Sequence, residues 1–441
     1  MATQEQKGTN WVAVITMMFI YGMISFVTNL AAPMGKVWLL QKGIDGSNML
    51  GMMGNMMNFG AYLFMGIPAG KMLLKCGYKK TAMIGIATGF VGVAIQFLSG
   101  KVPFAADGNA IVPFCVYLSG AFVCGFAVCM LNMVVNPMLN LLGGGGNRGN
   151  QLNMIGTTFN SLAGTTTPIL VGALIGQITK DTVVADVNLI MYIAMSVFAA
   201  AFVILSFIPI ANPEACNTTE KIPALAPLKF RHCLLGVIGI FMYVGIEIGI
   251  PATMDLWLSS ANGPLVKAGV TNAAGIAGMA AGTYWFLMLV GRTIGAFIGG
   301  KVSSRVLMTF TTFTAICLIV IGTQTTEISA KMLVFTGSGF QMVQVPLTAL
   351  LFALCGLMTS IMWPSTFNLA TEKLGKYTAA ASGLFMVMVV GGGILPLVQN
   401  GIADKFGHMV SYAVPALALG YLFVYSAFLS KPAKNIDELV K

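Results

Sequence analysis

Residues 233–258 read CLLGVIGIFMYVGIEIGIPATMDLWL, an apolar run that contains only two charged side chains, Glu247 and Asp255. A helix that crosses the hydrocarbon core of a bilayer needs about 20 mostly apolar residues. The run is long enough, so it predicts a membrane-spanning helix. The whole chain has the same character, because 57% of its 441 residues are hydrophobic and 9% are charged. Soluble domains carry about 25% charged residues, so the composition excludes a soluble protein.

Apolar runs of this kind recur along the chain between charged residues, Gly, Pro and Asn. The twelve predicted spans cover residues 11–33, 49–70, 82–99, 111–142, 151–178, 187–210, 233–258, 272–299, 306–323, 345–370, 378–400 and 409–430. The first run follows ten polar residues and lacks a small-residue cleavage site, so we expect a retained span and no signal peptide. The prediction is an all-α polytopic membrane protein.

Lys and Arg are distributed unequally between the two sets of predicted loops. With the N-terminus in the cytoplasm, the cytoplasmic loops hold sixteen of them and the outer loops seven, while Arg292 lies inside a span. Lys and Arg favour the cytoplasmic side, so this bias predicts cytoplasmic N- and C-termini in a cell inner (plasma) membrane. The cations form no contiguous basic face with interleaved aromatic residues, and we expect no nucleic-acid partner.

Signatures of catalysis and of metal binding are missing from the sequence. The eight Cys are scattered without a C-x-x-C pair, both His fall at span edges, and no G-x-S-x-G motif occurs. The Gly143–Gly146 loop has no Lys-Ser/Thr after it, so we predict no nucleotide site and no ATP-driven transport. We therefore expect neither an enzyme nor a bound metal or other cofactor.

The chain also shows signs of an internal duplication around a central linker. The predicted division is into an N-terminal half (1–210), a cytoplasmic linker (211–231) and a C-terminal half (232–441). Pro137 and Pro364 lie 227 residues apart, and Pro168 and Pro396 lie 228 apart. A shared offset across the linker favours two pseudo-symmetric six-helix halves. Such halves are typical of transporters that bind their substrate near the membrane midplane.

Several short patterns then occur in order between residues 15 and 425. They are Phe59-Gly60-Ala61-Tyr62, Pro68-Ala69-Gly70, Asn136-Pro137, Phe159-Asn160-Ser161, Tyr243-Val244-Gly245-Ile246-Glu247, Gly291-Arg292 with Gly295, Trp363-Pro364-Ser365-Thr366-Phe367, and Gly391-Gly392-Gly393-Ile394 with Pro396. In this order they resemble the fucose:proton symporter and glucose/galactose transporter family of the major facilitator superfamily. The resemblance implies a twelve-helix monomer that takes up a monosaccharide by alternating access.

Three positions depart from the fucose branch of that family. Fucose-type members carry an Asp in an Asn-Asp-x-x-x-Pro context, where this chain has Asn29 followed by Pro33. They carry a Glu four residues before Asn-Pro, where this chain has Asn132, an amide as in the hexose branch. Thr157 replaces a family Gln. Both carboxylates that the resemblance links to proton coupling are therefore neutral here, which argues against fucose specificity and against that coupling route.

Polar residues at helical spacing are the candidate solute ligands. A sugar presents hydroxyls and apolar C–H faces, so its site uses amides, carboxylates and an aromatic platform. The predicted binding residues are Asn29, Asn132, Asn136, Thr157, Asn160, Tyr243, Glu247, Trp285, Trp363 and Asn368. For each amide the alternative is interhelical packing. For Asn136 a structural role is favoured, because Pro137 frees a backbone carbonyl that an amide can satisfy.

Four charged residues receive specific interpretations. A carboxylate at the bilayer centre costs about 2.5 kcal/mol or more unless it is paired, solvated or protonated, so Glu247 is the predicted proton carrier. Arg292 is interpreted as a structural cation near a helix end, with an anion or gate contact as the alternative. Asp255 is expected to be a wetted gate residue. Lys71 belongs to a basic loop that resembles the superfamily's gating loop.

Together these observations favour a secondary transporter for a hexose-like sugar, coupled to protons through Glu247. The expected partners are the sugar, a coupling proton and the lipid bilayer. The alternatives are a sugar uniporter, a carrier of an amino sugar, nucleoside or organic anion, and, more remotely, a non-transporting nutrient sensor. The many Asn residues suit an amino sugar or a nucleoside, and Arg292 suits an organic anion.

Overall fold

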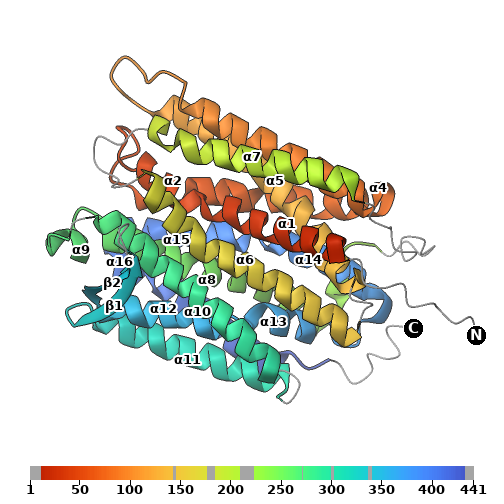
Figure 1. The fold of residues 1–441 in the computed structure, drawn as a ribbon. Helices are drawn as coiled ribbons and strands as arrows, with labels where there is room; N and C mark the ends of the chain where they lie inside the picture. The colour runs from red at the N-terminus through yellow and green to blue at the C-terminus, as the bar shows by residue number, and fades with distance from the viewer. Residues whose placement is uncertain are drawn as a thin grey trace, which may run out of the picture.

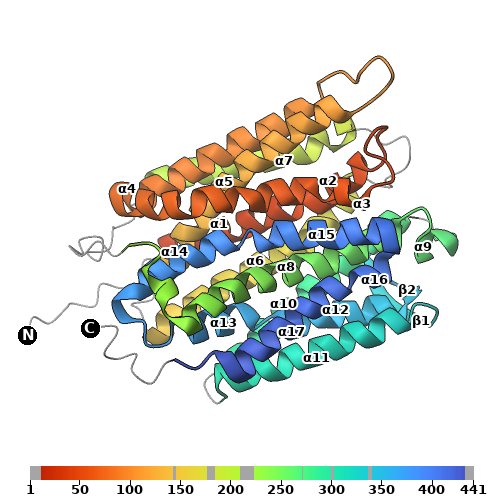
Figure 2. The ribbon, with the colours of Figure 1, turned by 180° about the vertical axis from the view of Figure 1, so that it is seen from behind.

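The computed structural model describes residues 11–142, 146–175, 184–208, 223–270, 272–298, 302–335 and 340–432. Long helices run side by side through the molecule (Figures 1 and 2). We call the end of the bundle at which α1 begins the terminal end, and the opposite end, where β1 and β2 lie, the hairpin end. Most of the predicted linker 211–231 lies outside the described residues.

The helices form two halves. The N-terminal half comprises α1 (Trp11–Asn29), α2 (Ala31–Trp38), α3 (Asn48–Gly51), α4 (Met53–Ser99), α5 (Ile111–Leu142), α6 (Gly146–Ile175), η1 (Val184–Val187) and α7 (Asn188–Phe207). The C-terminal half comprises η3 (Ala226–Lys229), α8 (Arg231–Ser259), α9 (Pro264–Lys267), α10 (Ala273–Ile298), α11 (Ser304–Gln324), β1 (Ser329–Phe335), β2 (Phe340–Pro346), α12 (Leu347–Thr359), α13 (Met362–Thr371), η4 (Gly375–Tyr377), α14 (Thr378–Met388), α15 (Gly391–Phe406), α16 (His408–Ser411), α17 (Ala413–Val424) and η5 (Tyr425–Leu429).

Ten stretches of the described chain are long and apolar enough to cross a membrane. The other two predicted spans are the part of α4 before Gly77 and the more polar α6. Gly77 has a φ of 78°, which only Gly adopts readily, and it divides α4 into two helices. Helix α6 packs against α1 of its own half and α10 of the other. The predicted helical bundle in two halves is thereby confirmed, with the hairpin β1–β2 as an addition that the sequence analysis missed.

Three spans are broken into two helices just before a proline. Proline lacks an N–H, and its ring clashes with the carbonyl four residues earlier. Helix α1 ends at Asn29, four residues before Pro33, and α16 ends at Ser411, four residues before Pro415. The break between α12 and α13 precedes Pro364 in the same way. Asn29 therefore sits where regular helical bonding stops, close to the centre of the bundle.

Small residues allow close contact between helices, and Gly356 is the clearest case. A Cβ at this position of α12 would lie 2.1 Å from the Tyr284 carbonyl oxygen of α10. We expect Gly356→Ala to push the two helices apart and cost about 1–3 kcal/mol of stability. The matched control is Gly383→Ala in α14, because a Cβ there meets nothing within 4 Å. Thermal unfolding in detergent should show a lower melting temperature for the first variant only; equal values would contradict the packing.

Candidate functional site

A cavity lies between the two halves, on the hairpin side of the bundle centre. The residues that line it come from α1, α2, the start of α4, α6, α8 and α10. They are Thr28, Asn29, Pro33, Lys36, Met52, Asn55, Val171, Ile248, Pro251, Ala252, Asp255, Ala274, Gly275, Gly278, Ala281 and Trp285. Among the predicted site residues, Asn29, Asp255 and Trp285 belong to this lining.

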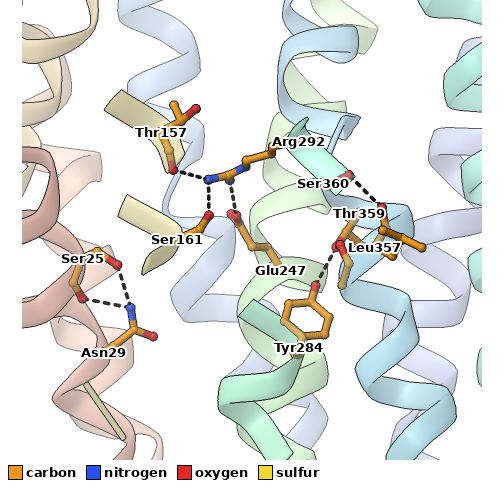
Figure 3. Close-up of polar contacts among 11 residues, drawn as sticks. Ser25, Asn29, Thr157, Ser161, Glu247, Tyr284, Arg292, Leu357, Thr359 and Ser360 are labelled. Carbon is orange, nitrogen blue, oxygen red and sulfur yellow. Dashed lines mark hydrogen bonds and ion pairs between the residues drawn. The ribbon is translucent and has the colours of Figure 1, made fainter. Parts of the chain in front are cut away.

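The N-terminal half contributes two amides to the cavity. The Asn29 Nδ2 donates to the Ser25 carbonyl oxygen at 2.9 Å and to its Oγ at 3.1 Å (Figure 3). Asn55, which the sequence analysis did not select, donates from Nδ2 to the Gly392 carbonyl oxygen of the other half at 2.7 Å. Asn55 could have been noticed as an amide near the start of an apolar span. The wall therefore carries polar groups next to apolar surface.

The opposite wall is one face of α10. Ala274, Gly278, Ala281 and Trp285 recur at intervals of three and four residues, so they share a face of the helix. The small side chains leave room for a solute, and the indole ring of Trp285 lies at the end of this row. Trp285 is buried and packs edge-on against Tyr284 at a ring separation of 5.8 Å. The predicted aromatic platform is therefore in contact with the cavity.

A buried ion pair stands at the hairpin side of the cavity. The Lys36 Nζ lies 2.5 Å from the Asp255 Oδ1, and the two side chains are 8% and 5% exposed. Lys36 also donates to the Ala274 carbonyl oxygen at 3.0 Å, so it joins α2 to α8 and α10. The prediction of a wetted Asp255 was wrong. The first span continues as α2 to Trp38, and this extension carries Lys36 into the bundle instead of leaving it in a loop.

A second ion pair lies on the terminal side of the cavity. The Arg292 guanidinium is 3.3 Å from the Glu247 Oε1. The same group donates to the Thr157 carbonyl oxygen at 2.9 Å and to the Ser161 Oγ at 2.7 Å (Figure 3). Because Glu247 and Arg292 belong to the C-terminal half and Ser161 to the N-terminal half, the guanidinium connects the halves. The interpretation of Arg292 as a helix-end cation missed this partner.

The remaining predicted ligands lie outside the cavity lining. Asn132 donates to the Tyr62 hydroxyl at 2.7 Å. Asn136 accepts from the Tyr21 hydroxyl and donates to the Asn132 carbonyl oxygen at 3.0 Å. The bonds to Tyr62 and Tyr21 join α5 to α4 and α1, and the bond between Asn136 and Asn132 lies within α5, so all three stay in the N-terminal half.

Five further predictions have mixed outcomes. Tyr243 is buried one turn from Glu247, and its ring lies 6.0 Å from that of Trp363. Asn160 is half-buried on α6, next to Ser161. Asn368 is exposed on α13, and Lys71 is exposed on α4 near the Gly77 turn. The structure therefore brings Tyr243 to the Glu247–Arg292 layer but leaves Asn368 and Lys71 away from the cavity.

Comparisons with known proteins agree with this architecture. A glucose/galactose transporter of Brucella abortus biovar 1 (strain 9-941) is 29% identical over 381 residues, which cover 85% of this chain and 84% of that protein. The L-fucose-proton symporter of Escherichia coli (strain K12) is 24% identical over 406 residues, 85% of this chain and 83% of that protein. Both belong to the group that the sequence patterns resemble, so the resemblance is confirmed.

Solved structures show the same fold. The crystal structure of a point variant of the E. coli fucose:proton symporter FucP has a TM-score of 0.67 at 18% identity, covering 95% of this chain and 98% of that chain. The nucleoside transporter NupG has a TM-score of 0.62 at 14% identity, covering 94% and 97%. These relatives are transporters and not enzymes. Because the Major Facilitator Superfamily profile also matches residues 14–395, most of the chain, this protein belongs to the Major Facilitator Superfamily.

Proposed function

We propose that this protein is a secondary transporter of a neutral, hexose-like sugar, which it takes up together with a proton carried by Glu247. The observation that carries the proposal is the cavity between the halves, which has one ion pair on either side. It is supported by the names of the relatives, which include a glucose/galactose transporter and an L-fucose-proton symporter.

The lining suits an uncharged solute with hydroxyl groups. Asn29 and Asn55 offer amide groups, and Trp285 offers an aromatic face for the apolar side of a sugar ring. The charges of Lys36 and Asp255 offset each other, as do those of Glu247 and Arg292. An organic anion would need a cation without such a carboxylate partner, so the lining favours a neutral solute. A nucleoside is the second candidate, because NupG shares the fold.

We infer that the hairpin end faces the cell exterior and that it is closed in this conformation. The Lys36–Asp255 pair ties the halves together there. At the same end, the Asp404 carboxylate of α15 accepts hydrogen bonds from Asn48 N at 2.8 Å and from Met49 N at 3.0 Å. Both contacts must break before an outward-facing state forms. The terminal end, where α1 begins, then lies in the cytoplasm of a cell whose inner (plasma) membrane holds the protein.

Glu247 is placed to couple a proton to movement of the halves. Its neighbour Ile248 lines the cavity, and Arg292 lies two turns beyond Trp285 on α10. When Glu247 is ionised it balances Arg292, which in turn holds Ser161 of the other half. Protonation removes that balance and leaves a buried guanidinium with neutral partners, which is unfavourable. Proton binding therefore removes the Glu247–Arg292 ion pair and destabilises the layer in which Arg292 also contacts Thr157 and Ser161 of the other half.

The test is solute uptake into vesicles that contain the purified protein, with and without an imposed pH gradient. We expect a neutral hexose to accumulate above its external concentration when the outside is acidic, and a protonophore to abolish this accumulation. Uptake that only equilibrates would make the protein a uniporter. Uptake restricted to nucleosides or to organic anions would overturn the sugar assignment.

Trp285 gives a direct test of the binding site. Loss of an aromatic ring that stacks on a sugar removes about 1–1.5 kcal/mol, so Trp285→Ala should weaken binding roughly five- to tenfold. Trp285→Phe should retain part of the affinity. Trp363→Phe is the matched control, because Trp363 packs on Tyr243 outside the cavity lining. Equilibrium binding to purified protein measures the effect. A larger loss of affinity in the Trp363 variant would show that Trp363, and not Trp285, stacks on the sugar.

A further inference from the structure

The hairpin of β1 and β2 has apolar side chains on both faces, and one face packs against described helices while the other is exposed. The strands are antiparallel, with Met332 opposite Val343 and Leu333 opposite Met342. Met332 is buried over the ends of the neighbouring helices, and β1 contacts both α10 and α12. Figure 1 shows the hairpin at the end of the bundle, beside α9 and α16.

The other face of the hairpin is exposed. Leu333 and Met342, which form a cross-strand pair, are 57% and 59% exposed, and Phe340 is 67% exposed. An antiparallel strand that faces water on one side normally alternates apolar and polar residues. Here the outward face carries the apolar side chains of Leu333, Phe340 and Met342 where polar ones are expected. Clustered exposed apolar side chains indicate a surface that another apolar phase covers.

The exposed face follows the lipid-facing surface of α11 along the chain. Along that helix Phe310, Phe313, Val320 and Ile321 are all exposed, which suits a helix in contact with acyl chains. Past the end of the helix, the exposed Ile328 leads into β1. Lys331 is exposed on the same hairpin face as Leu333, and its long side chain can carry a cation toward lipid phosphates. A short polar turn that includes Gln324 and Glu327 separates the exposed apolar residues of α11 from those of the hairpin, so the hairpin's apolar face follows the apolar span by only a few residues.

The equivalent connection in the N-terminal half has no such feature. The chain between α4 and α5, residues 100–110, forms turns and contains no strand. The hairpin is thus an addition to the C-terminal half and not a consequence of the duplicated architecture.

We propose that the outward face of this hairpin, formed by Leu333, Met342 and Phe340, lies in the interfacial layer of the membrane leaflet at the hairpin end. The occupant of this surface is lipid: acyl chains against the apolar pair and an anionic headgroup beside Lys331. The hairpin then anchors the C-terminal half in that leaflet, whatever solute the cavity carries.

The experiment uses a variant in which all eight Cys are replaced by Ser, with one new Cys at Leu333, at Met342 or at the control Asp107. Asp107 is exposed in the loop between α4 and α5 at the same end of the molecule. Each Cys carries an environment-sensitive fluorophore in vesicles whose lipids bear a nitroxide at a shallow or a deep acyl position. We expect labels at Leu333 and Met342 to emit at shorter wavelength than the label at Asp107. The shallow nitroxide should quench most of their fluorescence, and aqueous iodide should quench little of it.

The control should behave in the opposite way, with strong iodide quenching at Asp107. Iodide quenching at Leu333 and Met342 equal to that at Asp107 would place the face in water and overturn the proposal. Protection from both quenchers, with energy transfer between labels that rises with protein density, would show that a second copy covers the face. Melting temperatures matching the Cys-free parent confirm that each labelled variant is folded, since the two hairpin positions are exposed.

Discussion

Glu247→Gln is expected to abolish accumulation of solute against its gradient while leaving exchange of solute across the vesicle membrane. Gln has nearly the shape of the protonated side chain but cannot release a proton. The variant therefore imitates the loaded carrier permanently. Exchange needs only the loaded carrier to reorient, whereas accumulation also needs the proton to leave on the other side. The two assays separate these steps.

The same substitution should also lower stability. The Glu247 and Arg292 side chains are 14% and 17% exposed, so the pair is largely shielded from water. Removing one member of a buried pair leaves an uncompensated charge and typically costs about 3–5 kcal/mol. The contacts of Arg292 with Thr157 and Ser161 remain and should moderate the loss. A variant that also carries Arg292→Met should recover stability but not accumulation.

Glu372→Gln is the matched control for Glu247. Glu372 also pairs with an arginine, Arg305, but at 3.7 Å and with side chains that are 45% and 30% exposed. Exposed pairs of this kind contribute about 0–1 kcal/mol, so this variant should accumulate solute normally. If Glu247→Gln accumulates solute as well as the unmodified protein does, Glu247 does not carry the coupled proton.

The Lys36–Asp255 pair should be the second most sensitive point of the molecule. Asp255→Asn removes the negative charge and leaves the buried Lys36 ammonium with neutral acceptors among the described residues, the new amide oxygen and the Ala274 carbonyl. We expect a loss of about 3–5 kcal/mol and a marked fall in melting temperature. Lys36→Met should behave similarly, because it leaves the Asp255 carboxylate without its cation.

The double variant Lys36→Met with Asp255→Leu distinguishes a gate from a purely structural pair. Apolar residues of similar volume often replace a buried ion pair at no cost in stability, so its melting temperature should return toward that of the unmodified protein. Transport should stay slow. Opening this end exposes the two side chains to water, which hydrates the charges of Lys36 and Asp255 favourably but does not favour exposure of Met and Leu. Full recovery of transport in the double variant would show that the pair has a structural role only. Unchanged stability in both single variants would contradict the burial of the pair.

Much of the site was accessible from sequence because charge is scarce in this chain. Glu247 stood out as a carboxylate inside an apolar run, and Trp285 as an aromatic residue deep in a span. The residues that pair with them could not be inferred from the sequence. Arg292 lies 45 residues from Glu247 and on another helix. Asn132 and Asn136 had the correct spacing for a shared face, but spacing alone does not reveal which neighbour that face meets, and both proved to bond within their own half.

The membrane location and the helical class were determined by the sequence itself, because about 20 consecutive apolar residues have few alternatives to a spanning helix. Tertiary structure decided which charges meet. Helix α2 carries Lys36 to Asp255, and α10 carries Arg292 to Glu247 and to Ser161. Ion pairing acts over a few ångströms between segments far apart along the chain, and only the packing of helices brings such segments together. The hairpin also depended on packing, since its short strands are held by the helix ends beneath them.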